Sequence, residues 1–155
     1  GFCHQLKLLN LTELSKRIKK NEGYRNKAYN DKLNFKTIGY GHLIKKNEKK
    51  LLKGKFKKSL LIEIFNKDFK KAVSDFKKNY NYKKTPRRAQ EVIIEMIYQL
   101  GIRGVLKFKK FNKNINEGNI YLAAFEMLNS RWNKQTPKRV SKLIFILIYK
   151  NETKR

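Results

Sequence analysis

The stretch that decides the fold is residues 22–43, which read EGYRNKAYNDKLNFKTIGYGHL. Aromatic residues, threonine and glycine set it apart from the helical patterns on both sides. The apolar residues Tyr29, Phe35 and Ile38 lie on either side of the polar segment 31–34, an arrangement typical of two strands joined by a tight turn. The pattern predicts a small β-hairpin, and it places a carboxylate, Asp31, in the turn.

The residues before this stretch have helical spacing. Leu11, Leu14 and Ile18 predict a first helix over about residues 12–22, which ends at Gly23. The first lobe is therefore expected to combine one helix with one hairpin.

The chain after the hairpin is basic and loop-like over residues 47–58, and then helical in pattern. The first predicted helix is long and is capped by Ser59. The second begins at Thr85-Pro86, ends at Gly101 and has apolar residues so closely spaced that we expect it to be buried. Shorter helices are predicted over about residues 105–111, 119–128 and 140–149, and Thr136-Pro137 precedes the last of them.

Together these elements predict an α+β fold. We expect one domain over residues 1–155: a small N-terminal lobe of residues 12–58 with the hairpin, a larger helical lobe of residues 59–155, and an extension over residues 1–11. A cleft is expected where the two lobes meet.

Charge is the strongest bulk signal, because 39 Lys and Arg residues against 12 Asp and Glu residues give a net charge of +27. Such a field attracts any polyanion, including nucleic acid, anionic lipid and anionic cell-wall polymers, without selecting among them. The sequence has no nucleic-acid recognition element. We therefore expect non-specific attraction to polyanions but no specific nucleic-acid partner.

Other bulk features exclude several classes of protein. Cys3 is the only cysteine, so no intramolecular disulfide can form. No apolar run approaches the roughly 20 residues of a transmembrane helix. Residues 1–10 lack the pattern of a secretory signal. We expect a monomer without a transmembrane segment.

Glu22 and Asp31 are the candidate catalytic pair. They are carboxylates on different elements near the predicted lobe boundary, and Thr37 is expected beside Asp31 on the returning strand. Glycoside cleavage needs one protonated carboxyl group and one ionised carboxylate. Taken alone, however, the pair is better explained as two solvated surface acids.

Several short blocks resemble the phage-type lysozymes, a family of muramidases, and they occur in that family's order. The active-site signature is matched by Glu22-Gly23, Tyr29, Asp31 and residues 37–43. The later blocks are Phe65-Asn66-Lys67-Asp68, Gln99-Leu100-Gly101, Ser130-Arg131-Trp132, Gln135-Thr136-Pro137 and Arg139. The resemblance covers about residues 14–143, and several ordered blocks are more specific than a single motif.

The resemblance implies an activity and a role for each of three residues. Glu22 matches the general acid, Asp31 the residue that assists water attack, and Thr37 the residue that helps to place the water. The implied reaction is hydrolysis of the β-1,4 bond between N-acetylmuramic acid and N-acetylglucosamine in bacterial peptidoglycan, with inversion and with lysis of the cell. No metal or organic cofactor is implied, and the sequence contains no ligand cluster.

The same resemblance assigns supporting roles. Arg139 matches an arginine that pairs with the catalytic Glu22. Gly41, Leu43 and Gln99 match positions that bind or support the substrate.

His42 and Asp68 match a structural ion pair across the lobes. A departure from the family occurs at Glu95, where the family often has asparagine. This second acid is expected either to raise the pKa of Glu22 or to disturb its pairing with Arg139.

Two non-enzymatic alternatives stay open at this point. A cationic lytic or polyanion-binding protein would act through charge, for example by inserting residues 138–150 into anionic membranes. An inactive wall-binding module would bind peptidoglycan without releasing fragments. For an active enzyme, the resemblance implies residence in the host bacterial cytoplasm before lysis.

Overall fold

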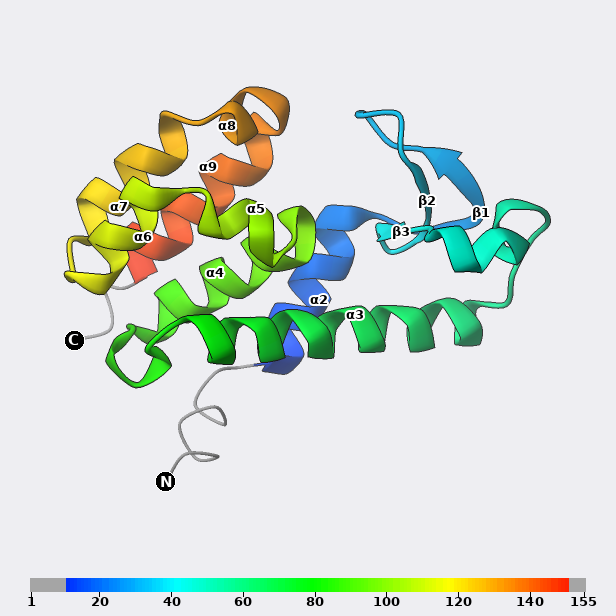
Figure 1. Ribbon diagram of the computed structural model, residues 1–155, viewed down its shortest axis with the longest axis horizontal. Helices are drawn as coiled ribbons and strands as arrows, with labels where there is room; N and C mark the ends of the chain where they lie inside the picture. Colours follow the sequence, from blue (N-terminus) through cyan, green and yellow to red (C-terminus); the bar gives the residue numbers. More distant parts are fainter. Residues whose placement is uncertain (1–10, 151–155) are drawn as a thin grey trace. The chain divides into compact units, whose positions relative to one another are not determined.

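The computed structural model describes residues 11–150 and has an α+β fold, mostly helical with one small antiparallel sheet (Figure 1). The described residues form two compact units, here called the N-terminal unit (residues 12–71) and the C-terminal unit (residues 72–150). The division lies inside helix α3 (Lys58–Asn79), between residues 71 and 72. The first turns of α3 belong with the sheet because Leu61 packs into the same core as strand residues.

The N-terminal unit confirms the predicted helix and hairpin and adds a third strand. The sheet has the antiparallel order β1-β2-β3, with Tyr29 opposite Thr37 and Thr37 opposite Leu43. The elements are α2 (Leu11–Glu22), β1 (Arg25–Asn30), β2 (Lys36–Gly39), β3 (His42–Leu43) and the 3₁₀ helix η1 (Lys46–Leu52).

Helix α2 ends where the sequence predicts. Gly23 has φ +74°, a left-handed conformation that glycine adopts without steric cost, and its N–H donates to the carbonyl of Lys19 at 3.0 Å. This C-cap fixes the point at which the chain leaves the helix, and therefore the position of Glu22.

The core of the N-terminal unit unites three elements. Ile38 of β2, Leu51 of η1 and Leu61 of α3 form a buried cluster. The prediction of a loop over residues 47–58 is wrong for residues 47–52, which belong to η1. Its helical turns depend on the burial of Leu51, a long-range contact that the local basic pattern does not reveal.

In the C-terminal unit, the central helix α4 (Arg87–Leu100) is buried as predicted. Residues 89–97 are buried without exception, including its carboxylates Glu91 and Glu95. The other elements are η2 (Tyr82–Lys84), α5 (Ile102–Leu106), α6 (Lys109–Asn116), α7 (Ile120–Leu128), α8 (Arg131–Gln135), α9 (Pro137–Phe145) and the π-helical turn η3 (Ile146–Lys150).

The single helix predicted over residues 105–111 is wrong, because the chain breaks there into α5 and α6. The carbonyl of Val105 accepts from the N–H of Phe108 at 3.0 Å and from the side-chain amide of Asn112 at 2.9 Å. These two bonds satisfy the end of α5 and replace the helical bond that would have continued it.

The helix cap predicted at Ser59 is wrong. Both Thr-Pro segments do precede helices, and Thr136 is the N-cap residue of α9, but neither threonine side chain makes a capping bond. The hydroxyl of Thr85 donates to the carbonyl of Asn81 at 2.8 Å, and that of Thr136 donates to the carbonyl of Trp132 at 3.3 Å. Both side chains therefore bond back to the preceding turn. Ser59 lies inside α3, which begins one residue earlier.

Helix α3 has 22 residues, but charged side chains interrupt its apolar positions throughout. Within residues 11–150, no helix combines the length and apolar character that crossing a bilayer requires.

Neighbouring leucines on α3 give a direct test of the N-terminal core. Leu61 is 1% exposed and Leu60 is 38% exposed. Because Leu61→Ala leaves a cavity, we expect it to lower the free energy of unfolding by about 2–5 kcal/mol. Leu60→Ala, the matched control, should change it by only about 0.5 kcal/mol. Urea denaturation followed by circular dichroism measures both, and equal losses would contradict this description of the core.

Candidate active site

The carboxyl group of Glu22 lies directly over the backbone of Gly41. Glu22 is the last residue of α2 and is partly buried, while Gly41 lies in the turn between β2 and β3 with φ +76°. A Cβ built on Gly41 would overlap the Oε1 and Cδ atoms of Glu22. The glycine is therefore required twice, for the backbone conformation and for the space that the carboxyl group occupies.

Asp31 is held by the hairpin turn that it starts. Its Oδ1 accepts the backbone N–H groups of Leu33 at 2.9 Å and of Phe35 at 2.8 Å. Its own N–H donates to the carbonyl of Phe35 at 2.9 Å. Aspartate commonly makes this type of turn, because its short side chain reaches backbone donors two to four residues ahead. The Oδ2 atom takes no part in the turn. The turn therefore orients the carboxylate through Oδ1 alone.

Tyr29 experiences the charges of both candidate catalytic carboxylates. Burial raises the pKa of the Tyr29 phenol, and the charges of Glu22 and Asp31 raise it further. The guanidinium of Arg25, 4.6 Å from the ring centroid, acts in the opposite direction but does not reverse the net increase. The phenol is therefore held in its neutral form, in a region where the potentials of the two acids overlap.

Thr37 lies beside this region on β2, paired with Tyr29 across the β1–β2 ladder. Its side chain is buried, and its hydroxyl donates to the carbonyl of Phe35 at 3.0 Å. With its hydrogen so engaged, the hydroxyl oxygen is oriented to accept a hydrogen bond. Leu43, opposite Thr37 on β3, is 52% exposed.

His42 lies between two carboxylates of the N-terminal unit. Its Nδ1 is 2.7 Å from Oδ2 of Asp68, on α3, and its Nε2 is 2.9 Å from Oε1 of Glu48, on η1. The same Glu48 oxygen accepts the backbone N–H of Lys45 at 2.9 Å. Both ring nitrogens donate only when the imidazole is protonated, so the geometry favours the imidazolium.

Titration of this cluster follows from its geometry. Burial alone would lower the pKa of His42, but the hydrogen bonds and charges of Asp68 and Glu48 outweigh burial and raise it above 6.5. Burial likewise opposes ionisation of Glu48, but the Lys45 N–H and His42 lower its pKa below 4.5. The cluster ties β3, η1 and α3 together most strongly when His42 is charged and Glu48 is ionised.

Asp68 is the partner predicted for His42 from the sequence, whereas the contact with Glu48 was not predicted. The local signal for Glu48 is its place three residues after Lys45 at the start of a helix, where glutamate caps backbone donors. Its contact with His42 is tertiary. Because the two carboxylates approach opposite ring nitrogens, they do not converge on one point, and within residues 11–150 no group of His, Cys, Asp and Glu residues is arranged to hold a metal ion.

Two of the sequence-predicted residues, Arg139 and Gln99, lie in the C-terminal unit. The Nε of Arg139 donates to Oε2 of Glu95 at 3.1 Å, and Glu95 is 0% exposed. Gln99 accepts the indole N–H of Trp132 at 3.0 Å. The departure from the family at residue 95 therefore gives Arg139 a buried carboxylate partner within its own unit.

Comparison with known proteins identifies the family of this chain. The family model described as phage lysozyme matches residues 19–145, a range that includes Glu22, Asp31 and Arg139. The chain belongs to the phage lysozyme family.

Two relatives from Dictyostelium discoideum match over most of their length. The protein named probable T4-type lysozyme 2 is 30% identical over 159 residues, which cover 88% of this chain and 94% of the relative. Probable T4-type lysozyme 1 is 33% identical over 153 residues, which cover 84% and 90%. This phage-lysozyme-family chain is thus a glycoside hydrolase of the lysozyme type.

The His42 cluster predicts a pH dependence of stability. The raised pKa of His42 means that its contribution is fully present below about pH 6.5 and is lost as pH rises through the folded pKa. The lowered pKa of Glu48 means that its contribution is present above about pH 4.5 and is lost as pH falls through the folded value. We expect the difference in unfolding free energy between wild type and His42→Gln to be largest between these limits.

Urea unfolding of both proteins from about pH 4 to pH 10 measures this difference. Subtracting the two profiles cancels the groups that titrate alike in both proteins. A difference that stays constant across that range would contradict the charged-cluster interpretation.

Gly41→Ala tests the contact with Glu22. The added methyl group meets the carboxyl group and also strains a backbone with positive φ, so we expect about 1 kcal/mol of destabilisation. Because misplacing a catalytic group by about 1 Å can cost about 10²-fold in rate, we expect kcat to fall by that order. Gly54→Ala is the control, since its φ is +89° and its Cβ would meet nothing within 4 Å. It should share the destabilisation and keep the activity.

Proposed function

We propose that this lysozyme-family chain is a muramidase that cleaves the β-1,4 bond between N-acetylmuramic acid and N-acetylglucosamine, with Glu22 as general acid and Asp31 assisting attack by water. The observation that carries the proposal is the placement of the Glu22 carboxyl group over the Gly41 backbone, in the same unit as the hairpin that orients Asp31. Cleavage of peptidoglycan strands would weaken the wall and lyse the cell.

Glu22 suits the acid role by its position. It is partly buried at a helix end, with its carboxyl group pressed against a glycine backbone rather than extended into solvent. The proposed role requires this carboxyl group to carry a proton when the substrate binds. In the proposed reaction it donates that proton to the glycosidic oxygen as the bond to the anomeric carbon breaks, so that the leaving sugar departs as a neutral alcohol.

Asp31 suits the complementary role. Two backbone N–H groups fix the orientation of its carboxylate through Oδ1. In the proposal the other oxygen, Oδ2, binds the attacking water molecule. In the proposed reaction it accepts a proton from that water as the oxygen attacks the anomeric carbon from the opposite face. The Thr37 oxygen accepts a second hydrogen bond from the same water. Attack from that face gives inversion at the anomeric carbon.

The decisive experiment measures reducing ends released from purified peptidoglycan that is free of lipid and nucleic acid. Because a general acid contributes about 10²–10⁴-fold to rate, we expect Glu22→Gln to lower release by that factor. Asp31→Asn should also lose activity while keeping the turn, since an amide oxygen can still accept the two N–H groups.

Glu13→Gln is the matched control, because Glu13 lies on the same helix α2 and is exposed. It removes one negative charge, as Glu22→Gln does, and should retain full activity. Equal activity in the Glu22 and Glu13 variants, with both proteins folded, would refute the assignment of Glu22. Binding of wild type to peptidoglycan without release of fragments would instead identify an inactive wall-binding module.

A further inference from the structure

The basic segment, defined here as residues 45–58, concentrates positive charge on one part of the N-terminal unit. It contains eight lysines, all exposed, and a single carboxylate. That carboxylate, Glu48, is engaged by His42 and by the N–H of Lys45, so it does not offset the lysines in solvent as a free acid would. The proposed catalytic reaction uses none of these lysines.

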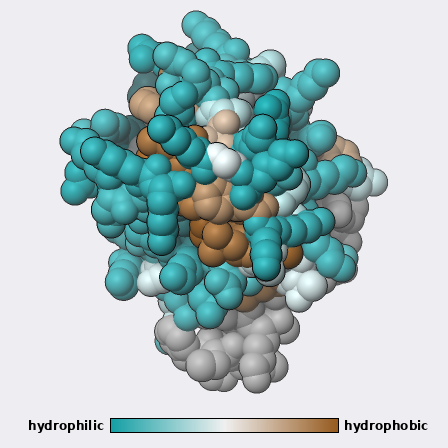
Figure 2. Space-filling model, turned by 90° about the vertical axis from the view of Figure 1, so that its right-hand side faces the viewer, coloured by the Kyte–Doolittle hydropathy of each residue, from teal (hydrophilic) through white to brown (hydrophobic). Residues whose placement is uncertain are grey.

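Exposed apolar side chains accompany this charge. Leu52 is 41% exposed and Leu60 is 38% exposed, and Phe56 is partly buried against the core of the unit. Figure 2 shows an apolar surface surrounded by hydrophilic side chains on the face seen from the right-hand side of Figure 1.

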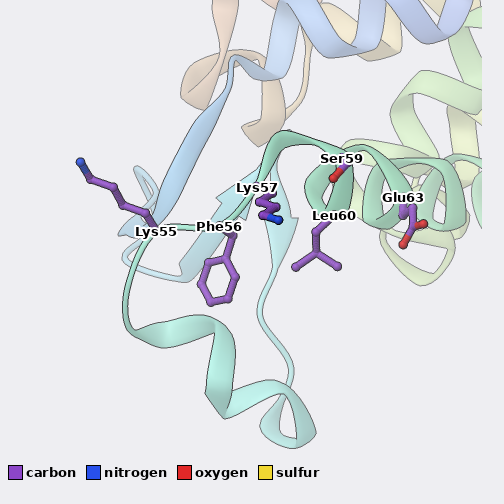
Figure 3. Close-up of a pocket in the computed structure, with 6 residues that line it drawn as sticks. All are labelled: Lys55, Phe56, Lys57, Ser59, Leu60 and Glu63. Carbon is purple, nitrogen blue, oxygen red and sulfur yellow. The ribbon is translucent and has the colours of Figure 1, made fainter.

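A shallow groove lies where the basic segment joins α3. Its volume is about 320 Å³, and in Figure 3 the Phe56 ring and the Leu60 side chain point to the same side while Lys55 extends away from them. Its lining residues are Lys55, Phe56, Lys57, Ser59, Leu60 and Glu63. Glu63 is the one carboxylate among them.

We propose that the basic segment, together with Leu52 and Leu60, is a docking surface for an anionic lipid bilayer. Lysine side chains keep their ammonium groups at the level of the lipid phosphates while their aliphatic stems lie along apolar surface. The exposed leucines then leave water for the boundary between headgroups and acyl chains. The interaction is peripheral, through side chains.

A bilayer fits these observations better than a soluble polyanion does. A soluble polyanion is attracted by charge alone and gives Leu52 and Leu60 no apolar environment to enter. An anionic bilayer complements both parts of the surface, phosphate for the lysines and hydrocarbon for the leucines. The charge and the exposed apolar area therefore have one explanation.

The test is co-sedimentation of the full chain with phosphatidylcholine vesicles that contain phosphatidylglycerol. Each lysine near an anionic surface contributes about fivefold in affinity. We therefore expect Lys53→Gln/Lys55→Gln/Lys57→Gln to bind about 100-fold more weakly. The control Lys107→Gln/Lys110→Gln/Lys113→Gln removes the same charge from exposed positions around α6. Because these lysines are not part of the proposed docking surface, this variant should lose less than about fivefold.

The apolar contribution has its own pair of variants. Leu52→Gln/Leu60→Gln should weaken binding about tenfold. The control Leu122→Gln/Leu128→Gln changes leucines on α7 that are 55% and 52% exposed and should bind as wild type does. Equal losses in the two lysine variants, or unchanged binding in Leu52→Gln/Leu60→Gln, would overturn the proposal. So would tighter binding to soluble polyglutamate than to vesicles.

Discussion

The contact between the Glu22 carboxyl group and the Gly41 backbone is the constraint around which the N-terminal unit is arranged. It requires α2 to end at Glu22, which the left-handed Gly23 ensures, and it requires the β2–β3 turn to pass directly beneath that helix end. A side chain at residue 41 would occupy the space of the carboxyl group. The hairpin that orients Asp31 is continuous with the same sheet, so the placement of one acid limits the placement of the other.

The cluster of His42, Asp68 and Glu48 supports this arrangement at the sheet's short third strand. His42 follows Gly41 directly, and its two ring nitrogens reach elements that are distant in sequence, η1 and α3. A buried imidazolium with a carboxylate on each nitrogen is held in one orientation, because loss of either partner leaves a buried donor unsatisfied. The turn that contains Gly41 is thereby held in place by His42, the residue that follows it.

The high positive charge has more than one consequence in such a molecule. A field of this strength is expected to attract anionic surfaces before any specific contact forms. Within the N-terminal unit, however, the lysines are concentrated in one segment. The basic segment places lysines beside exposed leucines, whereas the acids Glu22 and Asp31 are fixed by backbone groups and by a glycine. In the two proposals, therefore, attraction and chemistry are assigned to different residues.

Much of this protein follows from local sequence. The end of α2 is set by Gly23, the turn by an aspartate that bonds its own following N–H groups, and the burial of α4 by a dense apolar pattern. The resemblance of ordered short blocks to phage lysozymes identified the family, which the family model and the relatives confirm. Each of these signals lies within a few residues of the feature it specifies.

Tertiary structure alone decided the rest. Three features could not be predicted from the spacing of residues in the sequence. They are the helical turns of η1, the contact of Glu48 with His42 and the pairing of Arg139 with Glu95. The break between α5 and α6 depends on a side-chain amide that bonds a carbonyl seven residues away. Local patterns fix which elements form, because backbone geometry and periodicity are local. Which carboxylate meets which cation depends on the packing of those elements, since burial brings together charges that solvent would otherwise separate.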